Sequence, residues 1–598
     1  MAYIQRIIPS PNKIFSFPVK DFSGGLNNAS EMLMDNESSD LLNMAFTDRV
    51  LMEKRLGLDW YDSFQVLDAE GAGDDITYLG EYKPYVGDDE LIRASNLKVY
   101  SENYKIQDVL GQIDAVNFYG RFYFVDGDSL YVYGSFPAAT STYVRVVGDY
   151  TSKCVMKVVS PAEDFTPLTS EHVMGVTQYD YTNMEVSYEP CQNELDDSSK
   201  GVNIVPSNPK FICAHNGRVF LSGVKDDNDN VFISAVERPF YFPVGLPMQI
   251  PPDSDEIMGL IVYNNSVVVG RKQDIYVIMG DTNDTTLGFD LFVLKKLNTH
   301  TGFASGKAVS VVNNFLFFLG SDGIVYAMSS VNYDSKNLIT QIISGQLDLT
   351  KYPISVTYDD MATASAVYIT GEWYLSIADK VLLYSYDNRA WTLYDGFNAT
   401  SMYNRDNALI FGKSNGYVGC YGTNYLDYSH PYKAYWKSKN YDMDEPNLFK
   451  HFRDLTISAH TYEAYLSDIY IGVEIDYIDA SDEFHVESVV TLWGKAKFGE
   501  KFINRNITAS LPLWISRRGR TIRFTIMNGY VYEGYVNTLA DRDNWPDKYT
   551  GMVLYVLSNT TFYLYNEDRE WEVLDNSQMN QRMKIHQLNI DFETRGAR

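Results

Sequence analysis

The letters GKS within FGKSNG, residues 411–416, are the part of this chain that comes closest to phosphate-binding chemistry. A phosphate-binding loop needs a glycine five positions before its second glycine and a helix after it, so that backbone N–H groups can cradle the phosphates. Asn407 stands at that position, and no helix is predicted to follow. We therefore predict no nucleotide site and no cofactor.

A second candidate imitates a calcium loop. Asp226, Asn228 and Asn230 alternate as oxygen ligands would, and Glu237 stands at the twelfth position. Such a loop requires glycine at its sixth position for a sharp turn, and this chain has Val231 there. A hairpin turn between two strands explains the same letters, so we predict no metal site.

Other chemistry-bearing residues lack the spacing that a site needs. The four cysteines, at positions 154, 191, 213 and 420, form no CxxC pair, and the eight histidines include no HExxH motif. Paired carboxylates such as Asp359 and Asp360 arise by chance in so acidic a chain and favour a solvated face. We predict that the protein is not an enzyme, although carboxylates converging from different repeats, as in a glycosidase, remain open.

The elements that would position any site are short β-hairpins that recur along the chain. Each has two β-branched or aromatic runs joined by a polar turn such as NG, NN, SDG or KSNG, where a hairpin needs positive φ. The copies cover residues 117–134, 214–235, 262–280, 311–330, 367–386 and 402–422, with a looser copy at 80–101. Aromatic residues make up 14% of the chain, which also favours an all-β protein.

Four successive copies start at positions 214, 262, 311 and 367, so the period is close to the length of one four-stranded propeller blade. A long meander or a stack of sandwiches would also give hairpins, but would give no reason for this period. We predict a β-propeller of six to eight blades, with almost no helix outside an N-terminal arm.

A chain of 598 residues exceeds one core, and three parts are expected. They are an N-terminal arm (1–58), a propeller (59–430) and a C-terminal β-sandwich or barrel (431–598). An insertion at about 135–208 is long enough for an extra blade or a small side domain, and an excursion at about 529–582 would protrude as a hairpin module. Within the arm, apolar residues around an acidic turn between positions 31 and 44 favour a short helix that docks with the arm on the first blade.

The net charge of −28, from 78 acidic and 50 basic residues, argues against general nucleic-acid binding, which needs Lys and Arg to neutralise phosphates. Acidity keeps a large β protein soluble, or lines a passage through which a polyanion slides. Arg517, Arg518, Arg520 and Arg523 form a local exception. No apolar run of 18 residues predicts a membrane span, and Arg6 with nearby prolines breaks up a signal peptide, so synthesis in a cytoplasm is expected.

Three elements near the N-terminus resemble bacteriophage tail nozzle and packaged-DNA stabilisation proteins. An F-x-GG-L-N element comprises Phe22, Gly24, Gly25, Leu26 and Asn27; an acidic element comprises Asp35, Glu37 and Asn43; and a K-R-x-G element comprises Lys54, Arg55 and Gly57. The family's RPG is RLG here. A blade motif at Arg218, Pro239 and Phe242 and a W-x-SK-x-Y…F-K element running from Trp436 to Lys450 extend the resemblance.

The resemblance implies a virion protein of the tail or neck. It would form a homo-oligomeric ring, expected as a hexamer, below the portal and adaptor, and genomic DNA would pass through the lumen without tight binding. Assembly residues carried over are Phe22, Gly24, Gly25, Leu26, Asn27, Asn43, Arg55 and Gly57. On this view, deletion of residues 1–20 together with the GGLN segment leaves a folded monomer that cannot assemble. The alternative is a receptor-binding or glycan-binding propeller.

Overall fold

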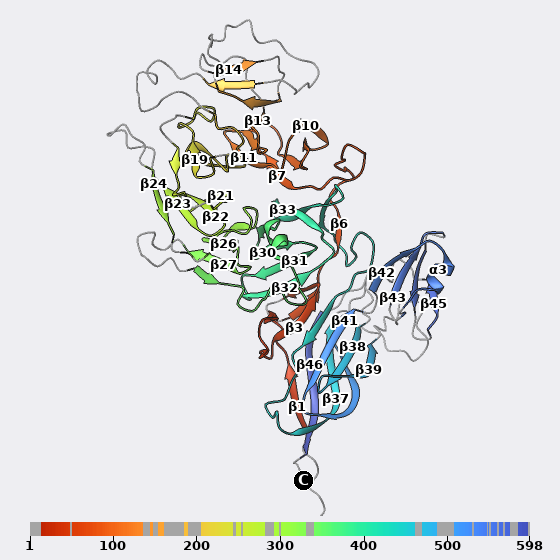
Figure 1. The fold of residues 1–598 in the computed structure, drawn as a ribbon. Helices are drawn as coiled ribbons and strands as arrows, with labels where there is room; N and C mark the ends of the chain where they lie inside the picture. Colours follow the sequence, from red (N-terminus) through yellow and green to blue (C-terminus); the bar gives the residue numbers. More distant parts are fainter. Residues whose placement is uncertain are drawn as a thin grey trace, which may run out of the picture.

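The computed structural model describes residues 14–47, 51–134, 144–147, 153–160, 185–188, 205–225, 227–242, 247–252, 255–280, 292–297, 299, 301–329, 340–460, 469–486, 508–528, 531–546, 548, 552–558, 561–565, 569–573 and 584–595. Figure 1 shows three bodies: a large ring of sheets at the top, a β-sandwich below it, and a smaller sheet beside the sandwich.

The ring is a β-propeller, and the described residues form seven blades. Each of the seven hairpins expected from the sequence supplies strands of one blade. The first three blades are β7 (Tyr78–Tyr82), β8 (Glu90–Ala94), β9 (Lys98–Ser101) and β10 (Tyr104–Asp108); β11 (Asp114–Phe118), β12 (Arg121–Val125), β13 (Leu130–Gly134) and β15 (Cys154–Val158); and β17 (Phe211–His215), β18 (Arg218–Ser222), β19 (Asn230–Ile233) and β20 (Met248–Gln249).

The other four blades complete the ring. They are β21 (Ile257–Tyr263), β22 (Ser266–Arg271), β23 (Ile275–Met279) and β24 (Val293–Lys296); β25 (Val309–Val312), β26 (Phe315–Leu319), β27 (Val325–Ser329) and β28 (Thr340–Ile342); β29 (Ser365–Ile369), β30 (Glu372–Ile377), β31 (Lys380–Ser385) and β32 (Ala390–Tyr394); and β33 (Ala399–Arg405), β34 (Ala408–Lys413), β35 (Val418–Tyr421) and β6 (Leu58–Trp60).

The propeller ring is closed by a strand from before the first blade. β6 precedes the first blade in the chain but pairs with β35 of the last, with Asp59 opposite Cys420. The first strand of the last blade, β33, also packs against β7 of the first. Because pairing of this kind joins the two ends of the ring, no blade needs a long exposed edge at the seam.

The turns that join the first two strands of most blades follow one local rule. In six of the seven described blades this turn is two residues long with both φ angles positive, as in Asn264 (45°) and Asn265 (57°). Two positive φ values match the right-handed twist of a hairpin. Asparagine, aspartate and glycine tolerate this conformation best, which explains the recurring NG and NN letters.

The insertion after β13 extends the second blade. β14 (Val144–Val147) and β16 (Glu185–Tyr188) continue the sheet beyond β15, with β16 parallel to β15 and antiparallel to β14. Most of residues 135–208 lie outside the described residues. The described strands of the insertion therefore belong to the second blade and do not form an additional blade.

The sandwich consists of two six-stranded sheets, and both take strands from the two ends of the chain. One contains β1 (Ile14–Val19), β4 (Met44–Thr47), β5 (Leu51–Lys54), β37 (Phe449–His460), β40 (Thr508–Gly519) and β46 (Lys584–Arg595). The other contains β2 (Gly25–Leu26), β3 (Glu37–Leu42), β36 (Tyr435–Ser438), β38 (Ile469–Ile475), β39 (Ile478–Val486) and β41 (Ile522–Asn528). One continuous core joins these sheets to the blades of β25–β32.

The N-terminal segment differs from the expected arm. Residues 14–47 and 51–54 supply strands of the sandwich rather than docking on the first blade, and the short helix expected between positions 31 and 44 is replaced by β3. Each buried polar group of β3 has a specific partner: Ser38 Oγ donates to the Lys437 carbonyl at 2.7 Å, and Asp40 accepts from Tyr435 Oη at 2.9 Å. These hydrogen bonds to residues far away in sequence stabilise a strand where the local pattern of apolar residues favours a helix.

The excursion after β41 is a four-stranded sheet of β42 (Val531–Val536), β43 (Met552–Val556), β44 (Thr561–Tyr565) and β45 (Trp571–Val573), with helix α3 (Leu539–Asp543). Val553 and Leu564 pack against Leu426, beside the junction of propeller and sandwich. A second five-residue helix, α2 (Tyr358–Ala362), links two blades. No helix in the described part of the chain is long and apolar enough to cross a membrane.

Candidate functional site at the junction of propeller and sandwich

The two chemistry-bearing stretches considered first both lie in hairpins. Lys413 of the GKS letters ends β34, and its ammonium lies 4.0 Å from the centre of the Tyr428 ring and 5.2 Å from that of Trp60. In the calcium-like stretch, Asn230 donates to Asp227 at 2.7 Å, and Asp226 lies outside the described residues. Among the described residues, no cluster of three or more metal-ligating side chains occurs.

The F-x-GG-L-N element instead lies where the sandwich meets the blade of β29–β32. Phe22 is buried with its ring edge-on to Trp436, and Leu26 joins the same core. Gly25 has φ +65°, and a Cβ there would lie 2.4 Å from the Trp391 carbonyl oxygen of β32. Glycine is required because the strand and the blade touch through their backbones.

The rest of this element is fixed by hydrogen bonds within the chain. A Cβ on Gly24 would lie 2.8 Å from the Asn36 carbonyl oxygen, and the Asn27 N–H donates to the Ser38 carbonyl at 2.9 Å. Asn28 donates from its side chain to the Asp348 carbonyl at 3.0 Å and accepts from the Asp348 N–H at 2.8 Å. The segment therefore ties the sandwich to the loop that follows β28.

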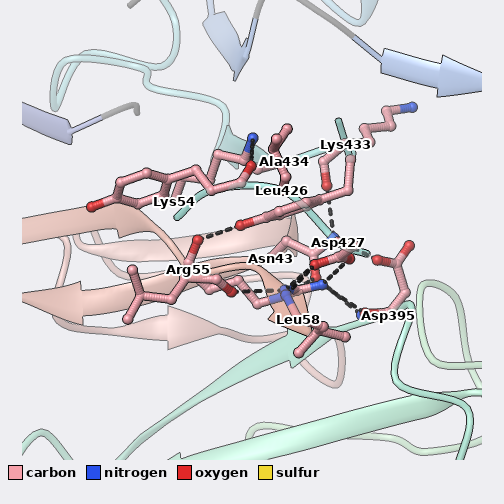
Figure 2. Close-up of polar contacts among 12 residues, drawn as sticks. Asn43, Lys54, Arg55, Leu58, Asp395, Leu426, Asp427, Lys433 and Ala434 are labelled. Carbon is pink, nitrogen blue, oxygen red and sulfur yellow. Dashed lines mark hydrogen bonds and ion pairs between the residues drawn. The ribbon is translucent and has the colours of Figure 1, made fainter. Parts of the chain in front are cut away.

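Arg55 is the centre of the junction (Figure 2). Its side chain is 1% exposed and forms a bidentate ion pair with Asp427, at 2.9 Å and 2.7 Å. The remaining donors reach Asn43 Oδ1 and two backbone carbonyls, those of Leu56 and Asp395, at 2.8–2.9 Å. All five N–H groups of the guanidinium thus have acceptors, as a buried charge requires.

Asn43 links the three segments that meet around Arg55. Its φ of 55° lies in the left-handed region, which asparagine tolerates better than most residues. Its side-chain amide donates to the Asp395 carboxylate and, at 2.7 Å, to the Lys433 carbonyl, while its Oδ1 accepts from Arg55 and from the Asp395 N–H. Burial raises the pKa of Asp395, and the bond from Asn43 opposes this.

Gly57 allows two backbones to pass at close range. Its N–H donates to the Asn424 carbonyl at 2.7 Å, and its carbonyl accepts from the Gly422 N–H at 2.8 Å. A Cβ at this position would lie 1.9 Å from the Leu426 carbonyl oxygen. The K-R-x-G element therefore holds residues 422–427, which lead out of the last blade.

The W-x-SK-x-Y element, which follows the propeller in the sequence, contributes to the same junction. Trp436 is fully buried against Phe22, Tyr441 Oη donates to the Asp35 carbonyl at 3.1 Å, and Lys439 pairs with the Asp35 carboxylate. At the far end of this element, the Lys450 ammonium donates to three backbone carbonyls. Motif elements separated by about 380 residues in sequence thus meet in one place.

The structure gives the eight assembly residues an intrachain role. The side chains of Phe22, Leu26, Asn43 and Arg55 are buried within a single chain, and their part in assembly stays a prediction. Deletion of residues 1–20 with the GGLN segment would remove β1, β2 and buried core residues, which argues against the expected folded monomer. In the blade motif, Arg218 donates to the Ser234 carbonyl at 2.8 Å and Phe242 is buried, again within the chain.

Several partners in this network carried no sequence signal, among them Asp427, Asp395 and Tyr432. Tyr432 lies with its ring 4.2 Å from the Arg55 guanidinium and donates its hydroxyl to the Arg55 carbonyl. These residues belong to no local pattern, since their role depends on segments hundreds of residues away. The one available clue was that a buried arginine needs an acidic partner, and that Asp395 and Asp427 stand near the last blade.

Lys54 gives the junction a pH dependence. Its ammonium is buried, donates to the Tyr425 carbonyl at 3.3 Å and lies 4.1 Å from the centre of the Tyr432 ring. Burial lowers the pKa of Lys54 to about 7, despite the attraction of Asp427. Between this value and the ordinary Lys pKa, the unfolded chain binds a proton that the folded chain does not, so stability rises with pH across that window.

We therefore expect Lys54→Met to flatten the pH dependence of unfolding. The free energy of unfolding of the wild type should rise relative to the variant by up to about 1.4 kcal/mol per pH unit between about pH 7 and 10. Urea unfolding at pH 6, 7.5 and 9 measures the difference, with exposed Lys105→Met as the control. Equal pH slopes in wild type and K54M would contradict the assignment.

A second lysine, half-buried, links two blades across the propeller. Lys307, just before β25, donates to the carbonyl of Thr77, just before β7, although these blades are not neighbours in the ring. Burial lowers the pKa of Lys307 to about 8 and raises that of Asp114, at the start of β11, to about 6. This hydrogen bond therefore spans the middle of the propeller.

No family model matches the chain, and no curated protein matches it. Among solved structures, the WD40 domain of Neurospora crassa Pan2 is 8% identical with a TM-score of 0.31, covering 62% of this chain and 96% of that domain. The AfRom2 CNH domain is 10% identical with a TM-score of 0.35, covering 61% and 98%. The extracellular domain of the putative hybrid two-component system BT4673 from B. thetaiotaomicron is 9% identical with a TM-score of 0.32, covering 88% and 53%.

Proposed function

We propose that the protein is a structural component of a bacteriophage tail or neck, where copies form a nozzle-like ring below the portal and adaptor that conducts and retains the genome. The observation that carries the proposal is the convergence of the motif elements. Phe22, Arg55 and Trp436 come from separate elements of the resemblance, and all three lie in one buried junction. Elements that resemble a family by chance have no reason to meet.

The junction suits a part that must stay rigid under load. A continuous core runs from the blades into the sandwich, and the buried Arg55–Asp427 pair spans the boundary. Strands from both chain ends pair within the sandwich sheets, so the chain enters and leaves the propeller through the same body. A stiff subunit of this kind gives a wall of constant shape.

The net charge and a contact across the propeller favour a conduit between subunits. The bond from Lys307 to the Thr77 carbonyl spans the middle of each propeller, so DNA would pass along the axis of the ring of subunits. The net charge of −28 would keep the wall from holding phosphates. The protein would act in the virion after synthesis in the host cytoplasm.

Electron microscopy of the purified protein and of virions tests this function. We expect rings with a central opening, and the same rings at the neck or tail of the particle. A monomer that binds host cells would favour the alternative, a receptor-binding or glycan-binding propeller. Exposed Tyr85 and Tyr104 on the first blade are the side chains that would stack on sugars in that case.

We also expect the isolated protein to show no affinity for duplex DNA in about 0.15 M salt. A wall that contacted about six phosphates would bind strongly and brake ejection, with an affinity that falls steeply as salt rises. A fluorescence titration with duplex DNA at several salt concentrations measures this. Micromolar binding that weakens steeply with salt would contradict the sliding-passage mechanism.

A further inference from the structure

The end of the sandwich remote from the propeller carries exposed arginine and aromatic side chains. β46 runs away from the propeller to this end (Figure 1), and pairing places Phe449 opposite Arg595 and Gly519 opposite Lys450. We call the surface formed here by Phe449, Tyr477, Ile478, Arg517, Arg518 and Arg520 the distal tip.

Large apolar side chains of the distal tip lie in solvent. Tyr477 is 73% exposed, Ile478 71% and Phe449 54%, and the Arg520 guanidinium lies 5.0 Å from the centre of the Phe449 ring. Arg517 and Arg518 are also exposed. Arginine and aromatic residues are enriched at the centres of protein–protein interfaces, where lysine is depleted. This composition favours a protein partner over a phosphate backbone.

A β-bulge orients the arginines. Phe452 pairs with Arg517 and Asp454 with Trp514, so two residues of β40 face the single Arg453 of β37. Ser516, in the bulge, has φ 47°, and its hydroxyl lies 3.4 Å from His451 Nε2. Bulges bend a strand and redirect the side chains that follow them. The bulge lies directly before Arg517 and Arg518, so it sets the course of the strand that carries them.

Two carboxylates of this end have partners within the chain. Asp476 accepts from the backbone N–H groups of Arg520 and Thr521 at 2.8 Å and 2.9 Å, and Glu593 accepts from Arg453 at 2.9 Å. The charges of Asp442 and Glu445, in the adjoining loop, act on the buried ammonium of Lys450. Arg523, the fourth arginine of the group, pairs with Glu474 and does not join the distal tip.

We propose that the distal tip is a docking surface for an acidic face of a second copy of this chain. The occupant follows from charge complementarity, because a chain with net charge −28 offers acidic surface to an arginine-rich tip. If the distal tip of one copy binds a different surface of the next copy, the contact is head-to-tail. Repeated head-to-tail contacts form a closed ring when the rotations between successive copies add up to a full turn. The inference rests on the proposed ring and names the surface that would build it.

The test compares two triple charge reversals by sedimentation velocity over a range of protein concentrations. R517E/R518E/R520E changes the distal tip, and Lys83→Glu, Lys225→Glu and Lys351→Glu together change the net charge equally at exposed positions elsewhere. We expect the wild type to self-associate, with an association that weakens as salt rises. The tip variant should need at least about tenfold more protein to associate, while the lysine variant associates like the wild type. Circular dichroism checks that both remain folded.

The outcomes separate this inference from the proposed function. Association that persists in the tip variant, or falls equally in both variants, overturns the docking surface but leaves the ring intact. A wild type that stays monomeric at every concentration overturns the ring as well. Duplex DNA binding that is lost in R517E/R518E/R520E without any change in self-association would assign the tip to phosphates and overturn the inference.

Discussion

Asp427→Ala should lower the free energy of unfolding by about 3–5 kcal/mol, because it leaves the Arg55 guanidinium buried without its counter-ion. The carboxylate accepts two bonds from Arg55 and a third from the Leu58 N–H at 3.0 Å. Leu58 begins β6, which closes the propeller, so loss of Asp427 also loosens the ring seam. Chemical denaturation followed by tryptophan fluorescence measures the effect.

The matched control is Asp108→Ala, which removes an ion pair of similar length on the surface. Lys105 and Asp108 lie 2.7 Å apart but are 47% and 57% exposed, so the change should cost at most about 1 kcal/mol. A double variant, Asp427→Leu with Arg55→Met, should be more stable than D427A because it leaves no unpaired charge. A D427A protein within about 1 kcal/mol of wild type would show that the pair does not hold the junction.

The second large effect is expected for Gly57→Ala, with a loss of about 3 kcal/mol. The new Cβ would lie 1.9 Å from the Leu426 carbonyl oxygen and 2.4 Å from the carbonyl carbon. These are backbone atoms, so no side chain can rotate aside and the two segments must separate. Separation weakens the hydrogen bonds from Gly57 to Asn424 and from Gly422 to Gly57, and with them the nearby Arg55–Asp427 pair.

Gly345→Ala is the matched control, since a Cβ at that position meets no atom within 4 Å and its φ is not positive. It should leave stability unchanged or raise it by less than about 1 kcal/mol, because alanine restricts the unfolded chain. Thermal unfolding of both variants gives the comparison. Equal unfolding temperatures for G57A and G345A would refute the close backbone contact.

The sequence by itself determined the propeller. Pairs such as Asn264–Asn265 and Asn313–Asn314 encode their turns through their own φ preferences, and the flanking apolar runs encode strands through alternation. Both signals act over a few neighbouring residues. They can therefore be read without knowledge of the rest of the fold, and their period gives the blade.

Only the tertiary structure decided the sandwich and the junction. β3 looks polar and helix-like in sequence because Glu37, Ser38 and Asp40 are buried against partners that lie hundreds of residues away, such as Gln346, Lys437 and Tyr435. Arg55 and Asp427 are likewise 372 residues apart. The stability of a buried polar group depends on its partners rather than on its own type. The sequence therefore carried no sign of partners such as Asp427, and the packing of the two chain ends decided that these residues hold one subunit together.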